Sequence, residues 1–280
     1  MSLPWVVVTD PLESQDIPLR RTKEFDRSGF FGELIGGIAP NQHIQFLSTD
    51  ARFNSSRNLI NHLVAPSFIA QVSGPHFYEV ATNMMEMWEL KCKIADSRPF
   101  NAYHDITFVA LDAIFAASFG HPKAESNTVQ RLHAVSQWNP VLSEDIDKPV
   151  GFPEADVPDV FSATLTLANS VTDTQLSLAP RLTSWVMRKF PFMKKAKAIK
   201  DKYIGGKVDE AVQLINSGDN NPTTPLHSVL LRERDVAKKE GRPPYYRSPA
   251  IADEFFGFTL AGHDTSATTI AWGVKFLADN

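Results

Sequence analysis

The chain has 280 residues, a formal net charge of −4 and 43% hydrophobic side chains. This length allows one large domain or two small ones, with enough apolar residues for a sizeable core. The slightly acidic balance argues against nucleic acid as the main partner. A single cysteine, Cys92, excludes a disulfide framework and a cysteine-based zinc site.

The N-terminal stretch predicts a short strand over Pro4–Val8, followed by a short helix over Pro11–Arg21. It has no basic region and only a short apolar run, so it does not resemble a signal peptide. No segment is a convincing membrane span, because the one apolar stretch of sufficient length contains Thr, His, Asp and Lys. As written, the sequence therefore predicts a soluble intracellular protein.

Apolar residues at helical spacing predict a mainly α-helical middle of the chain. The expected helices cover 74–93, 99–119, 161–185, 192–215 and 226–239, and the proline-rich, acidic residues 139–160 form a loop. The 192–215 helix is amphipathic and rich in lysine. Two interpretations remain open for it: a solvated face, or contact with a membrane surface.

The last stretch, 248–280, predicts one long helix. Ser248 can cap its start, and Pro249 suits the first helical position. Between Phe255 and Leu277 the only formal charges are Asp264 and Lys275. Because such a helix is apolar nearly all round, we expect it to be buried. At about 1.5 Å per residue it would be roughly 45 Å long and would cross a whole domain.

The middle of this helix departs from a core pattern. Residues 261–266 read Ala-Gly-His-Asp-Thr-Ser, where Leu and Ile would be expected. Gly262 costs about 1 kcal/mol of helix propensity relative to alanine. A buried Asp264 needs a partner or a proton, and Thr265 can donate its hydroxyl to the carbonyl of Ala261. The small residues leave room for something flat or bulky beside the backbone.

The AGHDTS segment, followed by ATTIAW, resembles the central helix of the cytochromes P450, whose pattern there is [AG]-G-x-[DE]-T-[TS]. The resemblance implies a heme-dependent monooxygenase with a mainly α fold. In that family Ala261 and Gly262 would leave room for dioxygen and substrate, while Asp264 and Thr265 would deliver protons. The implied partners are a small apolar organic substrate and an NADPH-dependent reductase, on the endoplasmic reticulum membrane.

A second match lies upstream. The segment from Phe53 to Arg57 falls where the family has W-x-x-x-R, and APSF follows at 65–68. The resemblance implies that Arg57 pairs with a heme propionate, a bond suited to a guanidinium, and that Phe53 stands in for the tryptophan at the cofactor edge.

The resemblance covers residues 1–280 as one partial P450 domain. The sequence contains neither the later E-x-x-R helix nor the F-x-x-G-x-x-x-C-x-G loop whose cysteine ligates the iron. Cys92 lacks the glycines of that loop, so we expect no metal ligand here. One hypothesis is therefore a truncated P450, inactive alone. The other is a non-catalytic helical module that binds an apolar ligand or a partner protein.

Overall fold

The computed structural model describes residues 6–279 and is mainly α-helical. The helices are α1 (Pro11–Arg20), α2 (Phe30–Ile35), α3 (Ala51–Ile60), α4 (Pro66–Phe68), α5 (Gly74–Ala95), α6 (Tyr103–Phe119), α7 (Asn127–Ser136), α8 (Asp159–Gln175), α9 (Pro180–Met187), α10 (Pro191–Asn216), α11 (Pro225–Glu240) and α12 (Pro249–Asp279). Among the described residues, β pairing is limited to an isolated bridge between Phe100 and Val150.

The N-terminal strand expected from the sequence is not seen. Pro4 and Trp5 lie outside the described residues, and Val6–Val8 have irregular backbone. The helix expected next is present as α1. Asp10 caps it by accepting hydrogen bonds from the backbone N–H groups of Leu12 and Glu13, at 2.8 and 3.0 Å.

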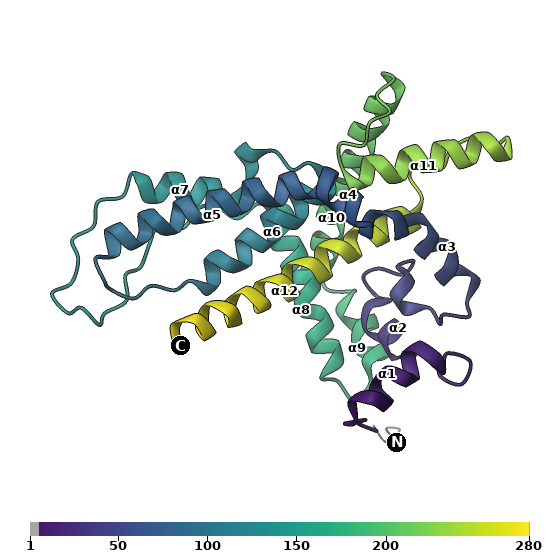
Figure 1. Cartoon of the computed structure of the whole chain (residues 1–280), viewed down its shortest axis with the longest axis horizontal. Helices are drawn as coiled ribbons and strands as arrows, with labels where there is room; N and C mark the ends of the chain where they lie inside the picture. Colours follow the sequence, from purple (N-terminus) through teal and green to yellow (C-terminus); the bar gives the residue numbers. More distant parts are fainter. Residues whose placement is uncertain (1–5, 280) are drawn as a thin grey trace.

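The long final helix is confirmed as α12, which crosses the whole molecule (Figure 1). Helix α6 packs along it, and α3, α8 and α10 also contact it. Most of α6 is buried because it is apolar nearly all round. Its ring of Phe115 lies 4.9 Å from that of Phe161 on α8 and 5.4 Å from that of Tyr203 on α10, so these helices share one core.

Two details differ from the sequence-based expectation. The stretch 161–185 is two helices, α8 and α9, with a break at 176–179 before Pro180. The short helix α7 was not predicted. Its start is fixed by Asp112 of α6, whose carboxylate accepts hydrogen bonds from the backbone N–H groups of Asn127 and Thr128 at 3.0 and 2.7 Å. The local N-cap Ser126 also accepts a hydrogen bond from the backbone N–H of Val129, at 3.3 Å, so a neighbouring and a distant side chain together fix this start.

The lysine-rich helix expected at 192–215 is confirmed as α10, but its apolar side is occupied. Met193, Ala196, Ile204, Val208 and Ala211 are buried in the core that α10 shares with α8. This stripe therefore cannot lie flat on a membrane. In the part of the chain that the structure describes, no helix is long and apolar enough to cross a membrane.

Candidate functional site

Helix α12 is buried in its first half and largely exposed in its second. Ile251, Phe255 and Phe256 are at most 2% exposed, whereas the residues from Asp264 to Ser266 are exposed. The expectation that the whole helix is buried was therefore wrong. Only the face that packs on α6 and α8 is covered along the second half, and the described residues provide nothing over the opposite face.

That uncovered side, here called the open face, consists of Ala261, Thr265 and Thr268, which follow one another at spacings of four and three residues. All three are exposed. As predicted, Thr265 Oγ1 donates a hydrogen bond to the carbonyl oxygen of Ala261, at 2.8 Å. This bond fixes the rotamer of the hydroxyl and leaves its acceptor lone pairs available to a ligand on the open face.

Gly262 faces another direction. A Cβ placed on it would lie 2.8 Å from Cδ1 and 2.9 Å from Cγ1 of Ile114 on α6. The glycine therefore allows α12 and α6 to approach closely, a packing role that the sequence pattern alone does not reveal. The room for dioxygen that the motif assigns to the Ala261–Gly262 pair stays a prediction, and in this geometry Ala261 is the member that borders the open face.

Asp264 is exposed, not buried as the sequence suggested, so it needs no buried partner. The buried polar residue here is His263, at 3% exposed. Its Nδ1 lies 2.7 Å from the carbonyl oxygen of Thr259, which makes Nδ1 the protonated nitrogen. Both residues line a hollow of about 260 Å³ between α6, α8 and α12. Asp264 thus lies between this hollow and the open face.

The second predicted pair lies on α3. Phe53 is buried and Arg57 is exposed, with the guanidinium carbon 5.8 Å from the Phe53 ring centroid. Arg57 has no ion pair with any of the described residues. Both side chains line a hollow of about 640 Å³ that also contains His43 and Arg27. An unpaired guanidinium at a hollow suits a carboxylate ligand.

A carboxylate that sequence reasoning did not place in the site connects these regions. Glu254 of α12 accepts a hydrogen bond from the backbone N–H of His43 at 2.7 Å, and its other oxygen lies 2.7 Å from His43 Nδ1. The His43 ring in turn packs edge-on against Phe53, at 5.7 Å between centroids. Residues 261–266 of α12 make no direct hydrogen bond or ring contact with Phe53 or Arg57 of α3 among the described residues. The short segment around His43 lies between them.

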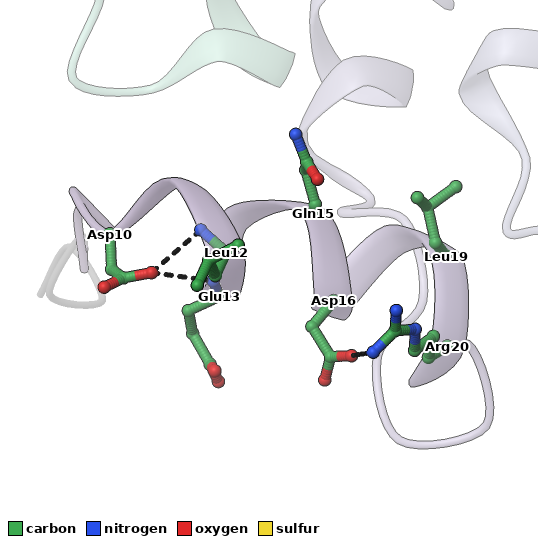
Figure 2. A pocket seen from close by; sticks show the side chains of 7 residues that line it. All are labelled: Asp10, Leu12, Glu13, Gln15, Asp16, Leu19 and Arg20. Carbon is green, nitrogen blue, oxygen red and sulfur yellow. Dashed lines mark hydrogen bonds and ion pairs between the residues drawn. The ribbon is translucent and has the colours of Figure 1, made fainter.

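A further hollow, along α1, does not have the properties of a site. Figure 2 shows that its lining residues all belong to α1 and its cap, with Asp10 turned to the helix N-terminus and Asp16 paired with Arg20. Leu12 and Leu19 are 76% and 74% exposed. Since one helix forms the whole surface, no second wall could enclose a ligand there.

Comparison with known proteins agrees with this geometry. The family model for cytochrome P450 matches residues 1–280. The chain belongs to the cytochrome P450 family. It is 34% identical to cytochrome P450 monooxygenase TRI13 of Fusarium sporotrichioides and 33% identical to cytochrome P450 monooxygenase GME11363 of Pestalotiopsis microspora. The identity to cytochrome P450 monooxygenase xilC of Penicillium crustosum is 27%. These matches cover 99–100% of this chain but 49% of each relative, so the chain spans about half their length.

The residues present fit a heme in two places: the open face of α12 could lie against the flat side of the heme, and Arg57 of α3 could lie at its edge. The open face of this P450 chain offers an unobstructed surface beside a hydroxyl, and Arg57 offers a cation without an ion pair among the described residues. No cluster of three or more His, Cys, Asp or Glu side chains in the described part of the chain could hold a metal ion. Cys92 is exposed near the end of α5, and it lacks the glycine-rich loop that presents the family's thiolate.

Proposed function

We propose that this chain forms the oxygen-side wall of a heme monooxygenase, which oxidises a small apolar organic substrate with dioxygen and electrons from an NADPH-dependent reductase. The observation that carries the proposal is the open face of α12. Ala261 and Thr265 are exposed on it, and the Thr265 hydroxyl is oriented by its bond to the Ala261 carbonyl.

Each predicted residue then has a role that its position allows. The bound heme would supply the redox and oxygen chemistry. Arg57 would bind one of its carboxylates, with the guanidinium kept beside the Phe53 ring. Ala261 would leave space beside the helix. Thr265 Oγ1, whose acceptor lone pairs remain available, would hold a water on the open face, and Asp264, which lines the hollow between α6, α8 and α12, would supply protons to that water.

Titration with hemin tests the binding part of this proposal. The 280-residue chain should show saturable changes in heme absorbance. Arg57→Gln should weaken binding about 10-fold, the effect of losing one charge-assisted hydrogen bond. Arg52→Gln is the matched control on the same helix, because Arg52 is already paired with Asp50 at 2.7 Å. Binding of an iron-free apolar ligand with no binding of hemin would instead favour a non-catalytic binding module.

A complementation experiment tests the activity. The chain is co-expressed with the part of the Fusarium relative that it does not match, and the mixture is reduced under carbon monoxide. We expect the Soret position typical of thiolate-ligated heme, and a Thr265→Ala variant that keeps this spectrum while oxygen consumption is uncoupled from product formation. Equal coupling in the Thr265→Ala variant and the parent would contradict the proton role of Thr265.

We also propose that the intact enzyme acts at the surface of the endoplasmic reticulum membrane. The lysine-rich face of α10 can contact anionic headgroups, although its apolar stripe is buried. The neighbouring helix α9 and its flanks contribute exposed apolar side chains: Leu178 and Leu182, Trp185, Phe190 and Phe192 are 47–105% exposed. Arg188 and Lys189 lie between them in the sequence. Apolar and basic side chains together are typical of membrane-surface contacts.

A further inference from the structure

The hollow between α6, α8 and α12 has walls of mixed character. It lies where α6 and α8 both contact α12 (Figure 1), and its volume is about 260 Å³. Since pockets for drug-sized ligands measure about 300–1,000 Å³, an occupant of this one would be smaller. The polar groups of the hollow include His263 and Asp264 of α12. Its apolar surface comes from Phe108, Leu165, Ala168 and Ala267.

His263 gives the hollow a hydrogen-bond acceptor. The side chain is 3% exposed, and its protonated Nδ1 donates to the Thr259 carbonyl oxygen at 2.7 Å. Nε2 is therefore unprotonated and can only accept, yet none of the described residues donates a hydrogen bond to it. Leaving a buried acceptor without a donor costs free energy. Because His263 lines the hollow, a molecule in the hollow could supply that donor.

Asp264 gives the hollow a negative charge without a countercharge. The carboxylate is exposed, lines the hollow and has no ion pair with any of the described residues. The lining residues include no Lys or Arg. His104, which also lines the hollow, has a carboxylate partner of its own, since its Nδ1 lies 2.9 Å from Glu154 Oε1. The hollow therefore favours a cation over a neutral or anionic ligand.

The hollow and the open face lie on different sides of α12. At about 100° per residue, His263 and Ala267 are turned away from Ala261 and Thr265, and Asp264 lies between the two sides. Burial agrees with this placement, because His263 and Ala267 are buried whereas Ala261 and Thr265 are exposed. A ligand in the hollow would therefore reach the Asp264 carboxylate without occupying the open face.

We propose that this hollow is a second ligand site, which binds a small organic cation with several N–H donors, such as an amidinium ion. The Asp264 carboxylate accepts two parallel hydrogen bonds from the planar cation, a geometry suited to such a pair. His263 Nε2 accepts a further N–H, and the apolar wall contacts the carbon skeleton.

A bound cation would hold the carboxylate that, in the proposed function, supplies protons to the open face. It would therefore inhibit oxidation without competing with the substrate. This effect rests on the proposed function, whereas binding of the cation does not.

Titration of the 280-residue chain with benzamidinium, in the absence of heme, measures binding. The NMR signals of the His263 ring, identified by their loss in His263→Phe, should shift saturably. Asp264→Asn keeps the shape and removes the charge, so it should weaken binding about 10-fold or more, the effect of losing a charge-assisted pair. Asp173→Asn is the matched control, because Asp173 is exposed on α8 and does not line the hollow.

Two ligands of the same shape separate the effect of charge from that of size. Benzamide is neutral and benzoate is an anion, and both should bind at least about 10-fold more weakly than benzamidinium. His263→Phe keeps a ring and removes the Nε2 acceptor, so calorimetry should show binding weakened about 3-fold or more. Equal binding of benzamide and benzamidinium, or equal losses in Asp264→Asn and Asp173→Asn, would overturn the proposal.

The enzyme completed with the remaining part of the Fusarium relative measures the inhibition. Benzamidinium should lower the rate of product formation and leave the KM for the substrate unchanged. Competition with the substrate would place the cation on the open face and overturn the inhibitory role, as would full activity at a saturating concentration. A completed enzyme without activity would contradict the proposed function, and the titration of the chain alone would still decide whether the hollow binds a cation.

Discussion

Asp105 and Arg131 form a buried ion pair, with Asp105 Oδ1 2.7 Å from Arg131 Nη1. Lys91 Nζ lies 2.7 Å from the other carboxylate oxygen, and the Trp88 indole N–H donates to that oxygen at 3.1 Å. The side chains of the three charged residues are at most 5% exposed. They join α5, α6 and α7 at the end of the molecule away from α3 (Figure 1).

Asp105→Asn should therefore destabilise the fold by about 3–5 kcal/mol, because it leaves the buried Lys91 without a countercharge and leaves Arg131 paired with Glu154 alone. Urea unfolding followed by circular dichroism measures this. The exposed pair of Asp16 and Arg20 is the control, since breaking it with Asp16→Asn should cost less than about 1 kcal/mol. Equal losses in the two variants would contradict the role assigned to Asp105.

Two histidines beside the start of α11 should make the fold sensitive to mild acid. Burial lowers the pKa of His62, with Arg232 acting in the same direction, and burial lowers the pKa of His227. His62 Nδ1 and His227 Nε2 are buried without a hydrogen-bond partner. Both histidines have a lower pKa in the folded chain than in the unfolded chain. At a pH between the folded-state and the unfolded-state pKa, the unfolded chain therefore binds more protons.

The free energy of unfolding should accordingly be highest above the ordinary histidine pKa of about 6.5. It should fall as the pH drops below that value toward the folded-state pKa values of the two histidines. Urea midpoints measured between pH 5 and pH 8 test this. The double variant His62→Gln, His227→Gln should lose most of the pH dependence over that range. If the urea midpoint of the double variant depends on pH as steeply as that of the parent, groups other than these two histidines cause the pH dependence.

Gly262→Ala should destabilise the chain by about 1–3 kcal/mol, since the added methyl group overpacks α12 against Ile114 of α6. Gly273→Ala on the same helix should be neutral or slightly stabilising, because it has open space and a better helix propensity. Combining Gly262→Ala with Ile114→Ala should cost less than the sum of the two single variants. Thermal unfolding of the parent, the two single variants and the double variant completes the double-mutant cycle.

Binding to lipid vesicles should depend on α9 more than on the exposed face of any other helix. Replacing Leu182 and Trp185 with serine should reduce co-sedimentation with anionic vesicles about 10-fold or more, from the apolar area lost. Met85→Ser on α5 removes a side chain of similar exposure (58%) and should have little effect. If the α9 variant and the α5 variant bind vesicles equally, the surface contact does not lie at α9.

The sequence predicted features that depend on local pattern. The long helix 249–279, the end of α6 at Phe119 and the bond from Thr265 to Ala261 all follow from residues a few positions apart. Gly120 has φ of 68°, the left-handed conformation that glycine adopts most readily. The family resemblance also came from local motifs, and the family match confirmed it.

Features that depend on distant partners were not predictable. Asp253 and Glu254 stand in the first turns of α12, where acidic residues favour a helix by local effects alone, yet their partners lie more than 200 residues earlier at Asn41 and His43. The exposure of Asp264 was missed for a related reason. Helical periodicity identifies apolar positions, but it does not tell which of them a neighbouring helix covers.

Different parts of the surroundings limit the side-chain size at the neighbouring positions Ala261 and Gly262. At position 262 the limit is set inside the scaffold, by a side chain of α6 that leaves no volume for a methyl group. At position 261 the side chain is exposed, so no neighbouring side chain of the described residues limits its size there. Saturation mutagenesis at 262 would therefore select for folding, whereas the same library at 261 would select among ligands, so two adjacent codons could be evolved for separate purposes.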